Sequence, residues 1–460
     1  MSEAAAAPVA TRRIAPGPRG NLFTGNRAAY ARDPIQMILD LQREYGDVAR
    51  ERVGPYLLHT VTHPDGVRQV LQGNYKNYVR GKFYENFKLF FGLGLLTTDG
   101  EYWLSHRRMA QPLFHRGIVE GCTESATDAV GRMLDRWQDA SAGGESIELV
   151  AETMRVSLSI LGRVVFNMDF SGYSDVISPS VLVGLKTMIP QGNLNDFIPH
   201  WVPTPYTRRL ARAQRTLREA MQKVIAEHAV GGEGTIDLIT LLQSGKDEET
   251  GRGLTDEEIH DEVMTVFMAG HETTGSGMAW TLYAIAQHPE VRRRLEAEVD
   301  DVLGDRAPTI EDLPRLAYAR MVVDESLRLY PPIWAFTRDP VTDDEIGGYH
   351  IPAGSTIVLS PYATHRHRDF WENPEAFDPE RFAPERAKSI APFSYFPFGS
   401  GSRKCIGFHL ALLQMQLLTA MVAQRFRVDA VPGHKVTYGR RMVALRPERG
   451  IRVTLQPRQG

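Results

Sequence analysis

One cysteine in a glycine-rich loop stands out as a residue whose setting could do chemistry. Cys405 lies in the segment Phe398-Gly-Ser-Gly-Ser-Arg-Lys-Cys-Ile-Gly407. A lone cysteine is ordinarily a small buried hydrophobe. Here, however, Arg403 and Lys404 favour the thiolate, and a helix expected to begin just after Cys405 would direct its positive end at the sulfur. Three glycines allow the backbone to turn tightly and to approach a flat group: Gly399, Gly401 and Gly407.

A thiolate presented in this way is a metal ligand or a nucleophile. Nucleophilic catalysis also needs a general base and an oxyanion hole, and residues of that kind are not evident around Cys405. The only other cysteine, Cys122, matches no motif and is expected to be an inert structural thiol. Two isolated cysteines exclude a disulfide scaffold, a zinc ribbon and a CxxC redox site.

A second group of reactive side chains interrupts an apolar helical pattern. The run Ala269-Gly-His-Glu-Thr-Thr274 follows apolar residues at helical spacing, and glycine and threonine within a helix reduce its stability. Thr273 can donate a hydrogen bond to the carbonyl of Ala269, which bends a helix and opens a small groove. We interpret His271 as structural or solvent-facing rather than as a metal ligand.

Glu325 and Arg328 are three residues apart and therefore share one face of a predicted helix. The spacing by itself is common, because Glu290 and Arg293 have it too. The second pair is expected to be a solvated surface pair.

The elements that must position these residues are mostly helices. Asp33-Pro34 predicts a helix that ends near Gly46, and Thr255 with Glu258 forms a capping box for a helix of roughly 30 residues that ends at Pro289. Further helices are expected up to Gly304 and from about Leu316 to Pro331. Hairpins are predicted for residues 48–53 with 56–62 and around Gly347-Gly348, the second continuing through 355–359.

Composition narrows the function classes. The 460 residues are 42% hydrophobic and 24% charged, which is typical of a globular protein, and a net charge of −3 gives no overall attraction for nucleic acid. The N-terminus lacks the apolar core of a signal peptide, and no segment is long and apolar enough for a membrane anchor. We therefore expect a cytoplasmic protein.

Five residues of the cysteine loop match the haem-binding signature FxxGxRxCxG, so the chain resembles the cytochrome P450 family: Phe398, Gly401, Arg403, Cys405 and Gly407. The run from Ala269 resembles the oxygen-activation motif [AG]Gx[DE]T[TS] of that family. Glu325-Ser-Leu-Arg328 resembles its ExxR helix, and Pro379-Glu-Arg-Phe382 resembles the segment that supplies the third partner, Arg381. The resemblance extends from Asp33 to Pro447.

The resemblance implies haem b (iron protoporphyrin IX) as cofactor, with Cys405 as axial thiolate ligand and Phe398 packed on the loop below. Glu272 and Thr273 would be the catalytic acid–alcohol pair that relays protons to bound dioxygen, and Gly270 would leave room for it. Contacts with the haem, including its propionates, are implied for a further set: Trp103, Arg107, Ala269, Gly270, Arg338, Phe398, Gly401, Arg403 and Gly407.

The expected fold is mainly α with small β-sheets, the cytochrome P450 fold with a long helix over a buried haem. Residues 1–25 are expected to form a flexible segment and 26–460 a single catalytic domain. The implied activity is a monooxygenase that hydroxylates or epoxidises a hydrophobic small molecule, as soluble bacterial members do with terpenoids, fatty acids or other secondary metabolites. Among these we favour terpenoids. Aromatic residues crowd one predicted substrate segment, although they could equally be core: Phe83, Tyr84, Phe87, Phe90 and Phe91.

Electrons are expected from a separate ferredoxin or flavodoxin with its reductase, because the sequence contains no fused redox module. An acidic donor would dock on a basic patch near the thiolate, predicted to comprise Arg107, Arg108, Arg116, Arg403 and Lys404; Arg108 is otherwise expected to face solvent. Two alternatives stay open. One is a peroxide-driven or rearranging haem-thiolate enzyme, although such relatives usually lack the acid–alcohol pair. The other is a non-catalytic haem-based ligand sensor, which would need an output module.

Overall fold

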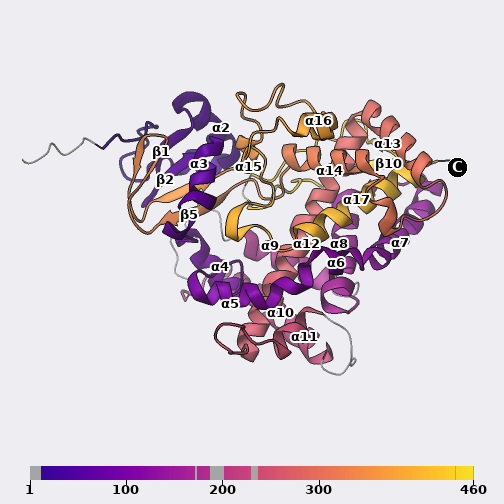
Figure 1. The fold of residues 1–460 in the computed structure, drawn as a ribbon, viewed down its shortest axis with the longest axis horizontal. Coiled ribbons are helices and arrows are strands. Elements are labelled where there is room, and N and C mark those ends of the chain that lie inside the picture. The colour runs from indigo at the N-terminus through magenta and orange to yellow at the C-terminus, as the bar shows by residue number, and fades with distance from the viewer. Residues whose placement is uncertain (1–11, 171–173, 187–200, 229–236, 441, 459–460) are drawn as a thin grey trace, which may run out of the picture.

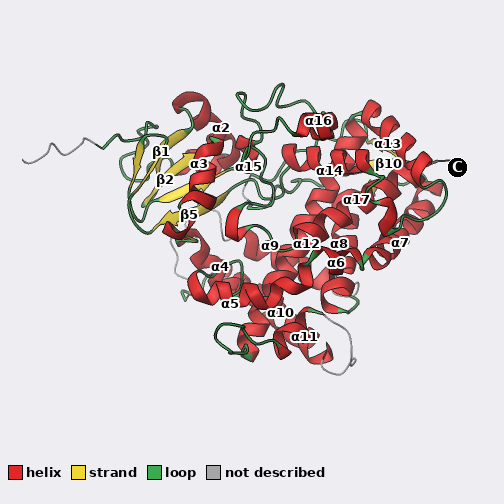
Figure 2. Ribbon diagram, in the orientation of Figure 1, coloured by secondary structure: helices red, strands yellow, loops and turns green. Residues whose placement is uncertain are grey.

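The computed structural model describes residues 12–170, 174–186, 201–228, 237–440 and 442–458. Its largest sheet lies toward one end, a smaller sheet lies among the helices toward the opposite end, and helices make up most of the rest (Figures 1 and 2), which confirms the mainly α fold class. The helices are α1 Arg27–Arg32, α2 Pro34–Tyr45, α3 Pro64–Arg68, α4 Glu85–Phe91, α5 Gly100–Ala110, α6 Arg116–Glu120, α7 Thr123–Ala142, α8 Leu149–Phe166, α9 Ser174–Leu185, α10 Pro205–His228, α11 Leu238–Ser244, α12 Asp256–Gln287, α13 Pro289–Val302, α14 Ala317–Leu329, α15 Pro361–Thr364, α16 Pro384–Ala387 and α17 Phe408–Arg425. The strands are β1 Val48–Val53, β2 Tyr56–Val61, β3 Tyr78–Val79, β4 Ile147–Glu148, β5 Phe336–Pro340, β6 Asp344–Ile346, β7 Tyr349–Ile351, β8 Thr356–Leu359, β9 Phe426–Ala430 and β10 Arg452–Pro457.

The largest sheet has the strand order β1-β2-β8-β5-β3. The predicted hairpin β1–β2 and the short hairpin β6–β7 are both present. Strand β8 does not continue the second hairpin as expected. It pairs instead with β2 and β5, because all four of its side chains are buried and need a sheet interior rather than a two-stranded ribbon.

Helix α12 is the long helix that the capping box predicts. Thr255 accepts a hydrogen bond from the amide of Glu258, whose side chain binds the amide of Thr255 in return. The helix has 32 residues, or about 48 Å at 1.5 Å per residue. Nearly all of its side chains from Ile259 to Ile285 are buried. It packs mainly on α8, and also on α14 and α17, so it passes through the core (Figure 1).

Residues 12–25 contact the large sheet. Ala15 is buried in the smaller hydrophobic cluster, the carbonyl of Pro16 accepts a hydrogen bond from the amide of Arg50, and Gly25 pairs with Val53. This stretch of the N-terminal segment is therefore held on β1. Residues 1–11 lie outside the described residues, and the single catalytic domain from residue 26 stays a prediction.

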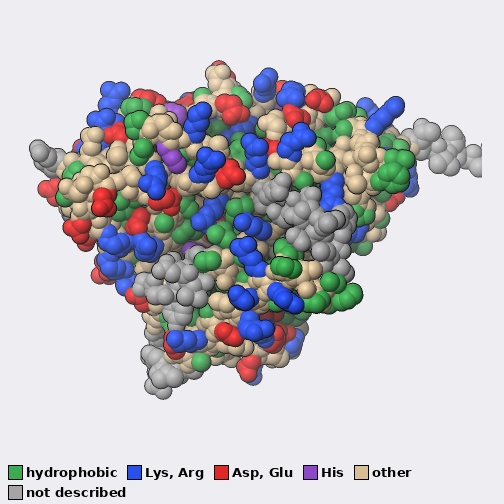
Figure 3. Space-filling model, turned by 180° about the vertical axis from the view of Figure 1, so that it is seen from behind, with side chains coloured by type: hydrophobic (Ala, Val, Ile, Leu, Met, Phe, Trp, Pro, Cys, Tyr) green, Lys and Arg blue, Asp and Glu red, His purple; other side chains and the backbone are tan. Residues whose placement is uncertain are grey.

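Charges of both signs are interspersed over much of the face seen in Figure 3, as expected for a net charge of −3. Among the described residues, no helix combines the length and the hydropathy needed to cross a bilayer.

Candidate functional site

The loop before α17 has a backbone shape that depends on glycine. The amide of Cys405 donates to the carbonyl of Phe398 over 2.9 Å, which closes the loop. Gly399 and Gly401 have φ angles of 66° and 68°, a region that side chains other than glycine disfavour. A Cβ on Gly401 would also lie 2.0 Å from the carbonyl oxygen of Leu71. Any larger residue at position 401 would push the loop away from residues 69–73.

The sulfur of Cys405 faces a space inside the protein. Its side chain has an exposed surface, and yet burial is the largest influence on its pKa and raises it. An exposed surface and a strong effect of burial are compatible if protein surrounds the Cys405 side chain and its sulfur borders an internal space. The amide of Gly407, at the predicted start of α17, donates to the sulfur, and the charges of Arg107 and Lys404 also lower the thiol pKa. The thiolate of Cys405 is therefore favoured by Arg107 together with Lys404, rather than by Arg403 as expected.

The middle of α12 presents an accessible stripe. Most residues from Ile259 to Ile285 are buried, but Ala269, Gly270 and Thr273 are only partly so. The hydroxyl of Thr273 donates to the carbonyl of Ala269 over 2.6 Å, as the sequence predicts. Because the helix is buried before and after this stripe, the three residues border an internal space.

Gly270 has a packing role besides the one expected from the sequence. A Cβ on Gly270 would lie 2.7 Å from the nearest side-chain atom of Leu161 on α8. Its lack of a side chain therefore lets α8 and α12 approach each other, in addition to any room that it leaves beside Thr273.

The carboxylate of Glu272 binds an arginine from the end of the chain. The Glu272 side chain is 1% exposed, and both of its oxygens accept hydrogen bonds from Arg446 Nη1, at 3.1 and 3.2 Å. Burial raises the pKa of Glu272, and Arg446 opposes that rise. Sequence reasoning missed Arg446. The available signal was a basic residue between apolar Leu445 and Pro447, in a segment that returns to the core.

His271 is buried, so the solvent-facing alternative is wrong. Its side chain is fully buried, 6.1 Å from the ring of Phe267. Within the described part of the chain, neither ring nitrogen has a hydrogen-bond partner. Burial, reinforced by the charge of Arg446, lowers the pKa of His271 to about 4. The ring is therefore neutral near pH 7 and serves as a packing element, which agrees with the structural interpretation.

Two buried arginines and one partly buried arginine meet at the edge of the large sheet. Arg403 donates to the carbonyl of Thr98 and to Asp99, at 2.8 and 2.6 Å, and its guanidinium lies 3.7 Å from the ring centroid of Trp103. Arg338 lies on β5, and the pairing of β3 with β5 places Arg80 opposite it. The arginine cluster thus comprises Arg80, Arg338 and Arg403.

The arginine cluster has more positive charge than its surroundings neutralise. Burial first, then the charge of Arg80, lowers the pKa of Arg338 to about 10 and that of Arg403 to about 9. The carboxylate of Asp99 opposes this lowering in both arginines. Buried charges need partners, so this cluster is built to receive an anion. The sequence alone does not predict Arg80 as a member of this cluster, because Arg80 belongs to no recognisable motif.

Trp103 and Arg107, although on one helix, lie in different surroundings. Trp103 packs against the guanidinium of Arg403, and its contact with a haem propionate stays a prediction. Arg107 donates a hydrogen bond to the side chain of Gln111, four residues further along the chain. Its positive charge interacts with the Cys405 thiol. That Arg107 binds a haem propionate stays a prediction.

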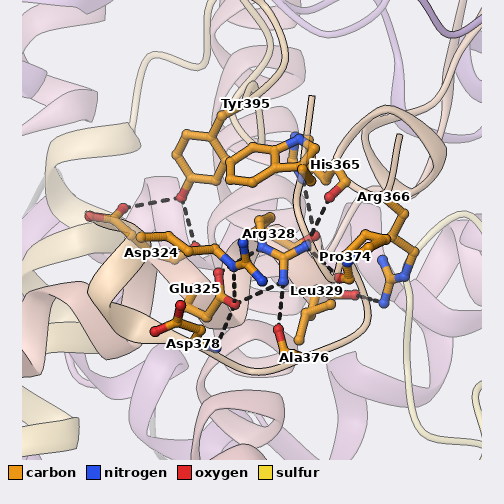
Figure 4. A network of polar contacts seen from close by, with 12 residues as sticks. Asp324, Glu325, Arg328, Leu329, His365, Arg366, Pro374, Ala376, Asp378 and Tyr395 are labelled. Atoms are coloured by element: carbon orange, nitrogen blue, oxygen red, sulfur yellow. Dashed lines mark hydrogen bonds and ion pairs between the residues drawn. The ribbon is translucent and has the colours of Figure 1, made fainter. Parts of the chain in front are cut away.

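The ExxR pair forms a buried network with the expected third partner (Figure 4). Arg328 donates to both oxygens of Glu325 at 2.6 and 2.8 Å, and Arg381 lies 3.4 Å from Glu325. Arg328 also donates to the carbonyls of His365, Pro374 and Ala376. This network ties α14 to the long loop that leads to Cys405.

The predicted basic patch is smaller than expected. Arg108 does not face solvent freely, because it forms ion pairs with Asp247 and Glu249 at 2.8 and 3.1 Å. Arg403 belongs to the interior cluster described above. Cys122 donates to the carbonyl of Ile118, and burial raises its pKa, which fits a structural thiol.

The aromatic residues of the predicted substrate segment are mostly buried. Phe87, Phe90 and Phe91 are buried, and the ring of Phe91 contacts both others, with ring centroids 4.6 Å apart in each pair. Tyr84 is buried beside Arg80, whereas Phe83 is partly accessible. Most of this aromatic group is therefore core.

Comparison with known proteins identifies relatives along nearly the whole chain. The family model described as cytochrome P450 matches residues 15–455. Similar proteins include cyclooctat-9-en-7-ol 5-monooxygenase and cyclooctatin synthase of Streptomyces melanosporofaciens, 35% and 34% identical over 418 and 433 residues. These alignments cover 89% and 92% of this chain, and 88% and 91% of the relatives. Pentalenene oxygenase of Streptomyces avermitilis is 31% identical over 404 residues, 87% of this chain and 88% of that protein.

Proposed function

The chain belongs to the cytochrome P450 family, and on that premise we propose that it hydroxylates or epoxidises a terpenoid, using electrons from a separate ferredoxin or flavodoxin with its reductase. Membership makes the protein a haem-thiolate monooxygenase with haem b as cofactor. The balanced reaction converts substrate, O2, two electrons and two protons into oxygenated substrate and water.

The residues present fit haem. Cys405 borders the hollow with its sulfur, and the accessible stripe of α12 borders an internal space. The arginine cluster lacks the negative charge that two propionates would supply. When bound, haem supplies the binding and reductive activation of dioxygen. Cys405 would hold the haem iron through its thiolate, and Arg338 and Arg403, joined by Arg80, would bind the propionates.

The observation that carries the proposal is the accessible Thr273 next to buried Glu272. The hydroxyl of Thr273 donates to Ala269, so its oxygen remains available to accept a proton or a hydrogen bond from the neighbouring space. Glu272 is a buried carboxyl whose raised pKa favours a proton-holding form, and partly exposed Arg446 connects it toward the surface. Together they provide a route for protons into a site that otherwise excludes water.

The terpenoid assignment rests on three relatives and on the character of the surroundings. The relatives carry names of terpenoid-oxidising enzymes. The apolar side chain of Leu161 lies next to Gly270, and apolar Met264, Phe267 and Met268 precede the accessible stripe on α12. Apolar surroundings suit a hydrocarbon scaffold.

Thr273→Ala is expected to separate oxygen consumption from product formation. Oxygen uptake should continue near its original rate, while product per O2 falls by about 10-fold or more and hydrogen peroxide rises, because delivery of the second proton is impaired. Oxygen, peroxide and product are measured together, with Thr274→Ala as the matched control. Unchanged coupling in Thr273→Ala would contradict the relay. A peroxide-driven enzyme would instead lose little product when peroxide is supplied, and a sensor would form none in either protein.

Arg446→Met is expected to shift the pH dependence of coupling. Arg446 favours the carboxylate of Glu272, so its removal raises the pKa of Glu272 further. If protonated Glu272 supplies protons, coupling is retained below this pKa and is lost as pH rises through it. The variant should therefore keep its coupling to higher pH than the unmodified enzyme. Coupling measured from pH 5 to 9 in both proteins tests this expectation. Superimposable pH profiles would contradict the role of Glu272 as the proton donor.

The proposed donor surface lies around Lys404, Arg116 and Arg320, whose charges all act on His409. Arg116 is the most accessible of these, with 72% of its side chain exposed, although it pairs with Glu120. Arg116→Glu should slow reduction by an acidic ferredoxin about 10-fold at low ionic strength and much less in 0.5 M salt. Stopped-flow reduction measures the rate, with Arg43→Glu on α2 as control. A loss that is equal at both salt concentrations would argue against electrostatic docking.

A further inference from the structure

We propose that Asp261, Glu262 and His106 form a clamp that fixes residues 92–98 against α12 and so sets one wall of the substrate space, an inference that rests on the proposed function. The three residues are positioning residues, since they act through the segment that they hold. Residues 92–98 connect α4 with α5 and read Gly-Leu-Gly-Leu-Leu-Thr-Thr.

Two neighbouring carboxylates on α12 accept backbone hydrogen bonds from this segment. Asp261 accepts from the amide of Leu93 at 2.6 Å, and Glu262 accepts from the amide of Leu95 at 3.2 Å. Their exposed fractions are 8% and 0%. Adjacent buried carboxylates are costly unless they are hydrogen-bonded, so the helix has ionisable groups here that it would not need for packing alone.

His106 completes the clamp from α5. Its Nδ1 lies 2.7 Å from the second oxygen of Glu262, and its ring stacks on Tyr102 at 4.1 Å between centroids. The hydroxyl of Tyr102 donates to the carbonyl of Leu93. One oxygen of Glu262 therefore binds residues 92–98, and the other binds His106 on α5. These two bonds fix the distance between residues 92–98 and α5.

The segment also fits α12 closely. A Cβ on Gly94 would lie 2.1 Å from the hydroxyl of Thr265, and one on Gly92 would lie 2.2 Å from the carboxyl carbon of Asp261. Within the segment, Thr97 and Thr98 donate to carbonyls of Gly92 and Gly94. The result is a compact turn seated directly on the helix.

Helical spacing relates the clamp to the reaction site. Asp261, Thr265, Ala269 and Thr273 follow one another at intervals of four residues, so that successive members lie about 40° apart around the helix, and Thr265 and Ala269 share a face. The first two contact the segment, and the last two form part of the accessible stripe. The segment therefore covers this face up to the point where the internal space begins.

The other end of the segment reaches the arginine cluster. The carbonyl of Thr98 accepts from Arg403 at 2.8 Å, and Asp99 binds both Arg403 and the amide of Arg80. Leu96, between the two attachment points, is partly accessible. Residues 92–98 thus span from the clamp to the proposed propionate site, with Leu96 placed to contact a bound substrate.

The test compares Glu262→Ala with Glu257→Ala, an exposed position of the same helix that pairs with Arg218. Hydrogen exchange of the Leu93 and Leu95 amides in the holoenzyme reports the clamp directly. We expect exchange to accelerate about 10-fold in Glu262→Ala and to stay unchanged in Glu257→Ala. Glu262→Gln, which retains an acceptor for the Leu95 amide, should restore most of the protection.

Ligand binding tests the consequence for the substrate space. The probes are 4-phenylimidazole, which needs space beside the haem, and imidazole, which needs little; both are titrated by the Soret shift. We expect the affinity for 4-phenylimidazole to change at least about 5-fold in Glu262→Ala, while imidazole affinity changes by less than about 2-fold. Gly94→Ala, which leaves the carboxylates intact but pushes the segment off Thr265, should reproduce this pattern if Glu262→Ala does not fold.

Unchanged exchange at Leu93 and Leu95 would overturn the clamp, and so would unchanged 4-phenylimidazole affinity in both variants. An equal change for the two probes would show a disturbed haem environment and would also overturn it. Failure of the proposed function looks different. It would appear as missing terpenoid oxidation by the unmodified enzyme, with the exchange result unaffected.

Discussion

Cys405→Ser is expected to reduce product formation by at least about 10³-fold while the protein remains folded, a loss typical of removing a residue on which the chemical step depends. Serine is close in size, and the loop is shaped by glycines and by the amide of Cys405 rather than by its sulfur. The variant lacks the thiolate that donates electron density to haem iron. Product is measured with the reconstituted ferredoxin and reductase, and folding by circular dichroism.

Cys122→Ser is the matched control for this prediction. Its thiol is hydrogen-bonded to Ile118 and has its pKa raised by burial, so it makes no thiolate under ordinary conditions. Activity should stay within about 2-fold of the unmodified enzyme, as for a substitution away from the site. Activity retained in Cys405→Ser, or lost in Cys122→Ser with the fold intact, would show that the ligand has been assigned to the wrong cysteine.

Arg328→Met is expected to lower the free energy of unfolding by about 3–5 kcal/mol, the cost of breaking a buried ion pair by removing one partner. The guanidinium is fully buried, and its donors bind Glu325 and three backbone carbonyls, as Figure 4 shows. Methionine fills part of the volume but removes the donor from these acceptors, and among the described residues Glu325 keeps the more distant Arg381 and the amide of Asp378. Urea denaturation of the holoenzyme measures the change.

Arg293→Met supplies the comparison, because Glu290 and Arg293 have the same spacing. Arg293 lies on the exposed face of α13 and donates to the carbonyl of Pro289 on its own helix. Its removal should change stability by less than about 0.5 kcal/mol. If both variants lost similar stability, burial of the ExxR network would not be the source of its importance.

Local patterns predicted the elements and residues whose function depends on nearby sequence. The capping box of Thr255 located α12, and the glycines around Cys405 indicated a loop with special backbone angles. The hydrogen bond from Thr273 to Ala269 also follows from helix geometry alone. In each case the interacting groups are within a few residues of one another.

Partners from distant parts of the chain were not predictable in the same way. Arg446 reaches Glu272 across 174 positions, and Arg80 joins Arg338 only because β3 pairs with β5. The clamp joins residues 92–98 to α12 across more than 160 positions. No periodicity or motif marks such contacts, because they are decided by how helices and strands pack. Once the fold is known, such contacts are found by looking for the partner that each buried charge needs.

The most direct test of the haem-thiolate assignment is the difference spectrum of the dithionite-reduced protein with and without carbon monoxide. A cysteine thiolate bound to haem iron predicts a Soret band shifted strongly to the red of that of ordinary haem proteins, and the loss of this band in Cys405→Ser but not in Cys122→Ser. An ordinary Soret band from folded, unmodified protein would mean that Cys405 does not bind the iron as a thiolate, and would contradict the account.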